Sequence, residues 1–206
     1  MGKVIADISM SLDGFVTASG QTPEEPLGKG GEQLHEWAFG QDEGDRELAE
    51  RAAAELGALV CGRTTYDDSL PWWEADGPTG ARRLPLCVVT HRAPEESPEG
   101  GVYTFVTDGI ERAVELAQEA AGGRDVAIMG GANLIQQCLA AGSVDEIGIH
   151  LAPVLFGDGT RLFADTAHQR LEPLDAVRTR AAIHLRFGVH GPAGYAGSAA
   201  PETRSA

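Results

Sequence analysis

Three short apolar runs, each followed by small or basic residues, constrain the fold of this chain more than any other feature. The runs are 58–61 (ALVC), 86–89 (LCVV) and 126–129 (VAIM), followed by 62–65 (GRTT), 90–92 (THR) and 130–133 (GGAN). Short runs bounded by glycine and separated by helical patterns are typical of buried parallel strands. Such sheets bind ligands at the carboxyl ends of their strands, so we expect the segments that follow the three runs to face one ligand. Glycine amides, a helix N-terminus and two arginines suit a phosphate-rich molecule such as a dinucleotide.

The remaining elements are predicted from periodicity and turn residues. Residues 3–11 alternate as a strand, which we expect at the sheet edge or facing the ligand. Helices are predicted to begin at 34–37 and to span 43–56, 110–121 and 134–141. A capping box starting at Thr107 should open the third helix, and Gly122 should end it. Further strands are predicted within 145–155 and, antiparallel, 178–189. The Gly/Pro-rich segment 19–31 either covers a pocket or only connects two elements.

Composition bounds the organisation and the partners of the chain. With 206 residues, of which 42% are hydrophobic, we predict one domain over 1–190 and a flexible tail over 191–206. No apolar run approaches the length of a bilayer span and the start lacks a signal-peptide stretch, so we expect a cytoplasmic protein without a membrane partner. A formal net charge of −15 argues against nucleic acid as a partner. Any phosphate must therefore be held locally.

Several chemistries lack their sequence signals. Cys61, Cys87 and Cys138 show no CxxC spacing and are predicted to be reduced core residues. The histidines at 35, 150, 168, 184 and 190 show no paired metal-ligand spacing, so we expect no metal. A G-x-S-x-G motif is absent, which argues against a hydrolase, and so is the Rossmann G-x-G-x-x-G.

The order of five motifs over residues 3–189 resembles the dihydrofolate reductase-like superfamily. Within it, the chain is most similar to the reductase domain of the riboflavin-biosynthesis pyrimidine deaminase/reductase (RibD C-terminal domain) and its stand-alone bacterial relatives. The motifs are 9–15 (SMSLDGF), 61–66 (CGRTTY), 89–92 (VTHR), 128–134 (IMGGANL) and 151–159 (LAPVLFGDG). The resemblance implies a three-layer α/β/α sandwich with a mostly parallel central sheet and antiparallel C-terminal strands. It also implies NADPH lying across the carboxyl edge, and a homodimer.

Cofactor contacts are implied by the same resemblance, position by position. The residues that look like the grip on the 2′-phosphate and pyrophosphate are Gly62, Arg63, Thr64, Thr65, Thr90, His91 and Arg92. The residues that look like the loop under the pyrophosphate and nicotinamide ribose are Gly130, Gly131, Ala132, Asn133 and Leu134. Elementary physics agrees, because Gly131 has no Cβ to block a close approach and the following helix dipole favours an anion.

Proton supply is the remaining catalytic task, because a cofactor carries the hydride and the protein positions the reactants. Asp7 and Ser9 share one side of the first strand and Asp13 lies just beyond it, so one of them could polarise a C=N or C=O bond. Alternatively, Asp13 stabilises its Asp-Gly turn and Asp7 is an exposed strand carboxylate. Trp37 is a candidate for stacking on a planar heterocycle, or a packing residue. Tyr66, Leu155 and Phe156 are the other candidate substrate contacts.

The expected function is an NADPH-dependent reductase of a small heterocyclic or carbonyl/imine substrate, similar to 5-amino-6-(5-phosphoribosylamino)uracil reductase. Two departures leave the substrate open. Segment 31–37 offers Glu32 or Glu36 without a clear match to the pterin-pairing acid of a dihydrofolate reductase, and the chain has no Cys/His deaminase motif. One alternative is a binding protein that keeps the NADPH or small-molecule groove without turnover. Another is an unrelated doubly wound phosphate binder.

Overall fold

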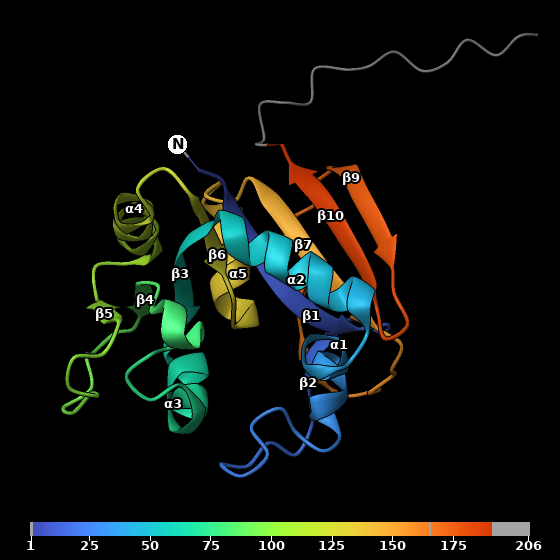
Figure 1. Cartoon of the computed structure of the whole chain (residues 1–206), viewed down its shortest axis with the longest axis horizontal. Helices are drawn as coiled ribbons and strands as arrows, with labels where there is room; N and C mark the ends of the chain where they lie inside the picture. The colour runs from blue at the N-terminus through green and yellow to red at the C-terminus, as the bar shows by residue number, and fades with distance from the viewer. Residues whose placement is uncertain (1, 165, 191–206) are drawn as a thin grey trace, which may run out of the picture.

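An eight-stranded sheet forms the centre of the molecule (Figure 1). The structure is a computed structural model and describes residues 2–164 and 166–190; the predicted tail at 191–206 lies outside the described residues. The strand order is β5 (Tyr103–Val106), β4 (Leu86–Val89), β3 (Leu56–Gly62), β6 (Asp125–Ile128), β1 (Val4–Ser11), β7 (Glu146–Ala152), β10 (Ile183–Val189) and β9 (Leu171–Arg178). The first six are parallel, and β10 and β9 are antiparallel to their neighbours. A separate ribbon pairs β2 (Phe15–Ala18) with β8 (Gly159–Arg161).

Helices cover both faces of the sheet, which confirms the predicted three-layer sandwich with its mostly parallel sheet and antiparallel C-terminal strands. On one face, α4 (Ile110–Ala121) and α5 (Ala132–Ala140) pack on a core that includes Val4, Ala6 and Ile128. On the other face, α3 (Arg63–Trp73) packs on Leu59 and Cys61 of β3. The remaining helical segments are η1 (Gly31–His35), α1 (Glu36–Phe39), α2 (Glu43–Glu55) and η2 (Gly80–Arg82). Within the described residues, no helix combines the length and apolarity needed to cross a bilayer.

The predicted strands match the structure where they are apolar throughout. Strand β4 has the predicted bounds, β3 extends the predicted run at both ends, and β6 is displaced by one residue, from 126–129 to Asp125–Ile128; these segments are buried on both faces. An edge position for the first strand was wrong: β1 pairs with β6 on one side and β7 on the other. Its polar alternation arises because one face of β1 packs on α4 and α5 while the other carries Asp7 and Ser9.

Element ends differ from prediction where a cap or glycine was misread. The N-cap of α4 is Gly109 rather than Thr107, whose hydroxyl lies 3.5 Å from Asp108, so the capping box was wrong. The helix does end at Gly122, which adopts a left-handed conformation. Helix α2 ends at Glu55 because the chain already enters β3 at Leu56, so Gly57 lies within a strand. Helix α3 and strands β2, β5, β8 and β9 were not predicted.

Candidate functional site

The carboxyl ends of β3 and β6 lie side by side at one edge of the sheet, where sheets of this kind form the crevice that binds ligands. The chain leaves β3 into α3 on one face, toward β4, and leaves β6 into α5 on the opposite face, toward β7. Connections that diverge in this way create the switch point at which open α/β sheets bind ligands. The Gly62 N–H donates to the Gly130 carbonyl over 2.9 Å, which joins the two strand ends at the floor of the crevice.

Two helix N-termini meet at this crevice. Gly62 is the N-cap of α3 and Gly131 is the N-cap of α5, and neither helix has a side-chain cap or an acidic residue in its first turn. By contrast, the first turns of α2 and α4 carry Glu43, Asp45 and Glu111. A helix N-terminus without an acid or a cap leaves its N–H groups and its partial positive charge for an external anion.

The Gly130-Gly131 peptide is cis, and the two glycines differ in their surroundings. Gly130 has a φ of +144°, and a Cβ there would lie 3.1 Å from Thr65 Oγ1. Gly131 has a φ of −94°, and a Cβ there would meet only Thr65 Oγ1, at 3.6 Å. The space over Gly131 is therefore open, as a loop that a phosphate approaches closely requires.

Arg63 is held over the crevice by its own neighbours. Its Nε lies 2.7 Å and 2.8 Å from the two oxygens of Asp67, one helical turn on, and its Nη1 donates to the Arg92 carbonyl over 2.9 Å. Thr90 Oγ1 donates to the same carbonyl over 2.8 Å. The strand-end segments of β3 and β4, which the sequence analysis proposed for the phosphate grip, are thus brought together.

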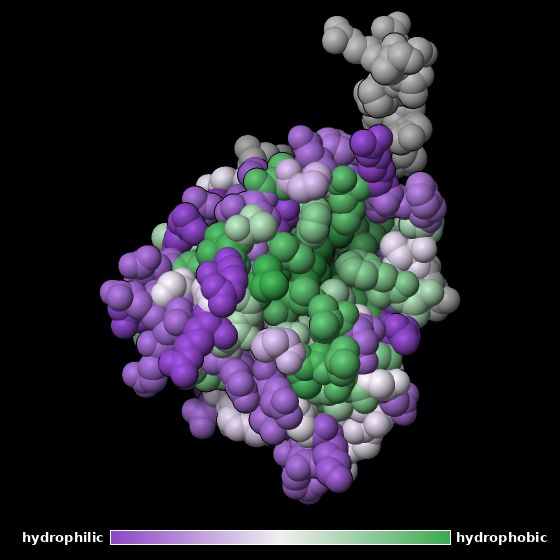
Figure 2. Space-filling view, turned by 90° about the vertical axis from the view of Figure 1, so that its right-hand side faces the viewer, coloured by the Kyte–Doolittle hydropathy of each residue, from purple (hydrophilic) through white to green (hydrophobic). Residues whose placement is uncertain are grey.

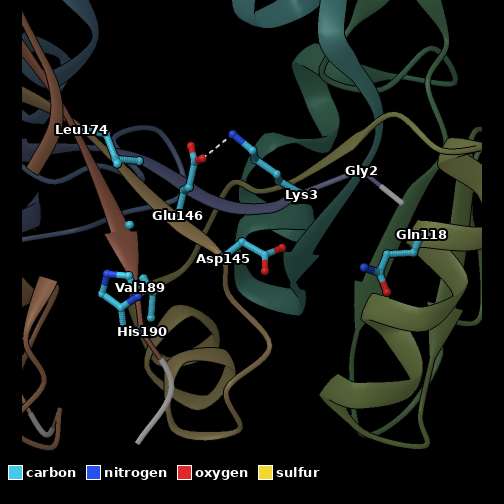
Figure 3. A pocket seen from close by; sticks show the side chains of 9 residues that line it. Gly2, Lys3, Gln118, Asp145, Glu146, Leu174, Val189 and His190 are labelled. Carbon is cyan, nitrogen blue, oxygen red and sulfur yellow. Dashed lines mark hydrogen bonds and ion pairs between the residues drawn. The ribbon is translucent and has the colours of Figure 1, made fainter. Parts of the chain in front are cut away.

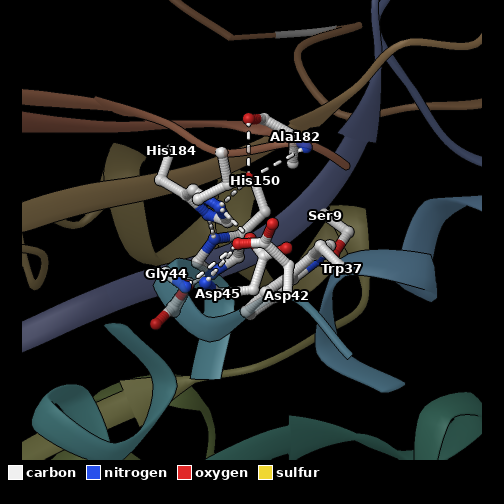
Figure 4. A network of polar contacts seen from close by, with 10 residues as sticks. Ser9, Trp37, Asp42, Gly44, Asp45, His150, Ala182 and His184 are labelled. Atoms are coloured by element: carbon white, nitrogen blue, oxygen red, sulfur yellow. Dashed lines mark hydrogen bonds and ion pairs between the residues drawn. The ribbon is translucent and has the colours of Figure 1, made fainter. Parts of the chain in front are cut away.

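A chain of four ionisable side chains crosses the sheet on the face that carries Asp7 (Figure 4). Asp7 Oδ1 lies 2.7 Å from His150 Nε2, and His150 Nδ1 lies 2.7 Å from His184 Nδ1. His184 Nε2 then lies 2.9 Å from Asp45 Oδ1. Strand pairing explains the alignment, because Ser9 pairs with His150 and His150 pairs with His184, so all project from one face.

Burial increases along this network of four side chains, from Asp7 on β1 to Asp45 on α2. The side chain of Asp7 is 27% exposed, that of His150 12%, that of His184 5% and that of Asp45 2%. Burial lowers the pKa of His184, the Asp45 carboxylate opposes that effect, and His150 adds to it. Burial, with a smaller contribution from His150, also lowers the pKa of His35. The imidazoles of His184 and His35 therefore give up a proton more easily than an exposed histidine does.

Trp37 packs over the network of four side chains at His150. Its Nε1 donates to Ser9 Oγ over 2.9 Å, and its ring stacks on His150 with centroids 3.9 Å apart. The structure thus brings together Asp7, Ser9 and Trp37, three of the predicted site residues. One ring face of Trp37 already contacts His150.

Asp13 has a different environment from Asp7. Its carboxylate accepts hydrogen bonds from Ser11 Oγ at 2.6 Å, Gly157 N at 2.7 Å and Phe156 N at 3.2 Å. The Ser11 hydroxyl, followed by the two backbone amides, lowers the pKa of Asp13. Because both oxygens are occupied, Asp13 ties the β1–β2 turn to the loop that contains Phe156. This geometry favours the turn-stabilising interpretation.

The candidate substrate contacts fall into two groups. Tyr66 is 1% exposed and packs edge-on against Tyr103 and Phe105, so its ring is a core residue and we withdraw it from the site. Leu155 is largely exposed and Phe156 is half-buried next to it. These two stay predictions.

Two hollows lie away from the crevice. One, of about 500 Å³, is at the amino edge of the parallel strands, where Lys3 contacts the buried Glu146 (Figure 3). Arg186 also contacts Glu146. The other, of about 710 Å³, is bounded by Asp42, Asp45 and Arg180 near the start of α2. Because ligands of such sheets bind at the carboxyl edge, neither hollow is our candidate cofactor site.

The three cysteines are buried and unpaired, as predicted. Burial raises the pKa of Cys61 to about 12 and those of Cys87 and Cys138 to about 11, which makes these thiols unreactive. Within 2–164 and 166–190, no group of three His, Cys, Asp or Glu residues is placed to hold a metal ion.

Comparison with known proteins identifies the family. The family model of the RibD C-terminal domain matches residues 2–187, so the chain belongs to the RibD C-terminal domain family. An uncharacterised Bacillus subtilis protein, YyaP, is 27% identical over 188 residues, which are 86% of this chain and 88% of that protein.

Solved structures share the fold. A Shewanella protein described as a riboflavin biosynthesis protein superposes with a TM-score of 0.67 and 22% identity, over 92% of this chain and 99% of that chain. A diaminohydroxyphosphoribosylaminopyrimidine deaminase/5-amino-6-(5-phosphoribosylamino)uracil reductase from Thermotoga maritima gives 0.62 and 11%, over 92% of this chain and 57% of that chain. An Enterococcus faecalis dihydrofolate reductase, solved in complex with NADP(H) and RAB-propyl, gives 0.58 and 15%, over 92% of this chain and 98% of that chain. These likenesses confirm the dihydrofolate reductase-like fold.

His150, His184 and Asp45 were missed by the sequence analysis. Metal-ligand spacing along the sequence does not reveal these histidines, because His150 and His184 lie on different strands. A usable signal was present, because His150 and His184 each lie within a predicted strand. The pairing register of β7 and β10 was needed to place the two rings in contact.

Proposed function

We propose that this chain is an NADPH-dependent reductase that acts on a small heterocyclic or carbonyl/imine substrate of the kind used in riboflavin synthesis. The observation that carries the proposal is the convergence of two acid-free helix N-termini on the open Gly130-Gly131 loop at the switch point of the sheet. Membership of the RibD C-terminal domain family supports it. The similar fold of the Enterococcus faecalis reductase, solved with NADP(H), supports the choice of cofactor.

Each part of the crevice has a task in this proposal. The amides at the start of α5 bind the pyrophosphate above Gly131, and those at the start of α3 bind the phosphate nearer Arg63. The Arg63 guanidinium, positioned by Asp67 and the Arg92 carbonyl, recognises the 2′-phosphate. When bound, the cofactor supplies the hydride. The chain positions the acceptor carbon within about 3 to 3.5 Å of it and provides the proton.

The deciding experiment measures binding and turnover separately. Titration with NADPH should raise the melting temperature progressively once its concentration exceeds Kd, and NADH should do so only at much higher concentration. NADPH oxidation is then followed with 5-amino-6-(5-phosphoribosylamino)uracil, dihydrofolate and a panel of small imines and carbonyls. Binding without oxidation of NADPH by any of them favours the alternative of a non-catalytic binding protein. Failure of NADPH to stabilise the protein would refute the proposal.

We also propose that the chain is a homodimer formed through its C-terminal strands. Figure 2 shows apolar residues gathered on the side of the molecule where β9 and β10 lie. Ile183 is exposed there, and Leu185 and Val189 of the same strand are only partly buried. An apolar face next to the edge strand β9 is a surface that oligomers commonly cover.

A further inference from the structure

The hydrogen bonds among Asp7, His150, His184 and Asp45 need three protons, one for each contact. With both carboxylates ionised, the Nε2–H groups of the two rings serve Asp7 and Asp45. Two neutral imidazoles then have no proton left for the Nδ1–Nδ1 contact, where two lone pairs would meet at 2.7 Å. The bonded geometry therefore contains one proton more than two neutral imidazoles supply. With both carboxylates ionised, the three contacts are complete when the two rings share one additional proton.

The surroundings of the pair fit a held but releasable proton. The carboxylates at both ends stabilise the charge, and Trp37 shields the His150 ring from water by stacking on it. Burial of His184 opposes the charge. The titratable groups that face the two rings are Asp7 from β1, Asp45 and its N-cap neighbour Asp42 from α2, and His35 from η1. Thr179 adds a hydroxyl 3.3 Å from His184 Nε2.

The Asp7 end of this four-residue network lies on β1, next to the strand that leads into the glycine loop. Pairing of β1 with β6 runs only as far as Ala6 with Ile128, so Asp7 is the first residue at which the two strands separate. Gly130 follows Ile128 by two residues, which places Asp7 beside the strand end that leads into the glycine loop. Asp7 is also the most exposed of the four side chains. Within the described residues, its Oδ2 has no hydrogen-bond partner, whereas Oδ1 contacts His150.

We propose that Asp7, His150, His184 and Asp45 form a proton relay, in which the two imidazoles store one shared proton and Asp7 passes it to the substrate. The proposal rests on the proposed reductase function. It assigns the proton-donating task to Asp7 rather than to Asp13, whose oxygens are occupied by hydrogen bonds. His150 acts through Asp7, and His184 and Asp45 are positioning residues that stabilise the stored charge.

The step balances as follows in atoms and electrons. Hydride transfer from NADPH to the carbon of a C=N or C=O bond pushes the π-electron pair onto the nitrogen or oxygen. That atom takes the proton of the Asp7 carboxyl, and His150 Nε2 has supplied this proton to Asp7. His150 keeps its Nδ1–H, which now donates to His184, so both rings end neutral. Solvent water restores the missing proton through the partly exposed Asp7.

The shared proton is testable without substrate or cofactor. Protein labelled with ¹⁵N at histidine is titrated by NMR, and the ring nitrogens of His150 and His184 are assigned by single replacement. We expect the two rings to take up one proton between them as pH falls, and Asp45→Asn to move this uptake to lower pH by at least about one unit. Independent uptake of a full proton by each ring, or no change in Asp45→Asn, would overturn the proposal. If Asp45→Asn does not fold, Asp7→Asn is the second variant, and the same shift is expected.

Delivery of the proton is tested by the pH profile of NADPH oxidation with whichever substrate of the panel is reduced. Asp7→Asn should lower kcat by about 10²- to 10⁴-fold at every pH. Asp45→Asn should lower kcat about tenfold at the alkaline side and much less at the acid side, with KM for NADPH unchanged. The matched control is His190→Asn, which removes an exposed histidine paired with Glu172. It should change kcat neither at the acid side nor at the alkaline side of the pH profile.

The outcomes separate this inference from the proposed function. A wild-type protein that binds NADPH and reduces a substrate, with unchanged kcat in Asp7→Asn, would refute the relay and leave the reductase intact. A wild-type protein that does not use NADPH would refute the reductase and the delivery step together. The NMR titration alone then decides whether the imidazoles share a proton.

Discussion

A methyl group at Gly131 is the sharpest probe of the cofactor site. The φ of −94° is allowed for any residue, and the added Cβ would meet only Thr65 Oγ1 at 3.6 Å, which is ordinary van der Waals contact. Gly131→Ala should therefore change the free energy of unfolding by less than about 1 kcal/mol. Gly130→Ala should cost about 1 to 3 kcal/mol, because its φ of +144° is one that side chains rarely adopt and Thr65 lies 3.1 Å away.

NADPH binding should be weakened by Gly131→Ala, although this substitution leaves the free energy of unfolding nearly unchanged. The methyl group of Gly131→Ala occupies the space that the pyrophosphate needs, and lifts it from the amides at the start of α5. Loss of one hydrogen bond to a charged group costs about 1.5 to 3 kcal/mol, which corresponds to a Kd for NADPH that is about 10- to 150-fold higher. Gly131→Val should abolish binding at accessible concentrations.

The assay combines fluorescence titration with NADPH and thermal unfolding of the same samples. Gly188→Ala is the matched control, because its Cβ would make only contacts of 3.7 Å or more and it lies in β10, away from the crevice. Normal NADPH affinity in a folded Gly131→Val protein would show that the loop is only a tight strand-to-helix turn, and the cofactor site would have to be sought elsewhere.

Three further perturbations follow from other contacts. Arg63→Ala should raise the Kd for NADPH by about 10- to 150-fold and leave that for NADH nearly unchanged, since only NADPH has the 2′-phosphate; equal losses by titration would contradict this role. Asp13→Asn should lower the melting temperature at neutral pH, and the difference should vanish in acid. The pKa of Asp13 is lower in the folded protein, so its stabilisation is present above the ordinary aspartate pKa of 3.8 and is lost as pH falls through the lower pKa of the folded state. Ile183→Glu should halve the mass measured by light scattering from that of a dimer, and a monomeric wild type would refute the dimer.

Local sequence patterns were sufficient to predict the central strands and the residues that follow each strand. Runs such as 86–89 are apolar at every position and short, and between turn residues this pattern is typical of a strand buried on both faces. The strand-end residues Gly62, Thr90 and Gly130 follow directly, because parallel strands bring their carboxyl ends to one edge. The same local patterns predicted a helix over 134–141, and α5 begins two residues earlier, at Ala132.

Elements whose stability comes from tertiary contacts were not accessible in the same way. Strand β9 is mostly exposed and carries Pro173, so its pattern resembles a loop, and it forms because β10 offers an unpaired edge. Helix α3 contains Pro71 and has only one buried residue, Tyr66. The contact between His150 and His184 depends on the register of an antiparallel pair 34 residues apart, and no spacing rule in a single sequence encodes a register.

The distribution of acidic residues leads to a last prediction, at Asn133 in the first turn of α5. The chain carries 31 acidic residues, yet the first turns of α3 and α5 have none, although an acid there would stabilise each helix. Asn133→Asp should therefore stabilise the protein by about 0.3 to 1 kcal/mol and at the same time weaken NADPH binding. Two charges about 8 Å apart repel by about 0.5 to 2 kcal/mol for an effective dielectric constant between about 80 and 20, which is about 2- to 30-fold in Kd. The loss should shrink at high salt, because Asn133 is exposed. Tighter or unchanged NADPH binding at low salt would show that α5 does not face the phosphates, and the absence of acids from its first turn would then have no connection with a ligand.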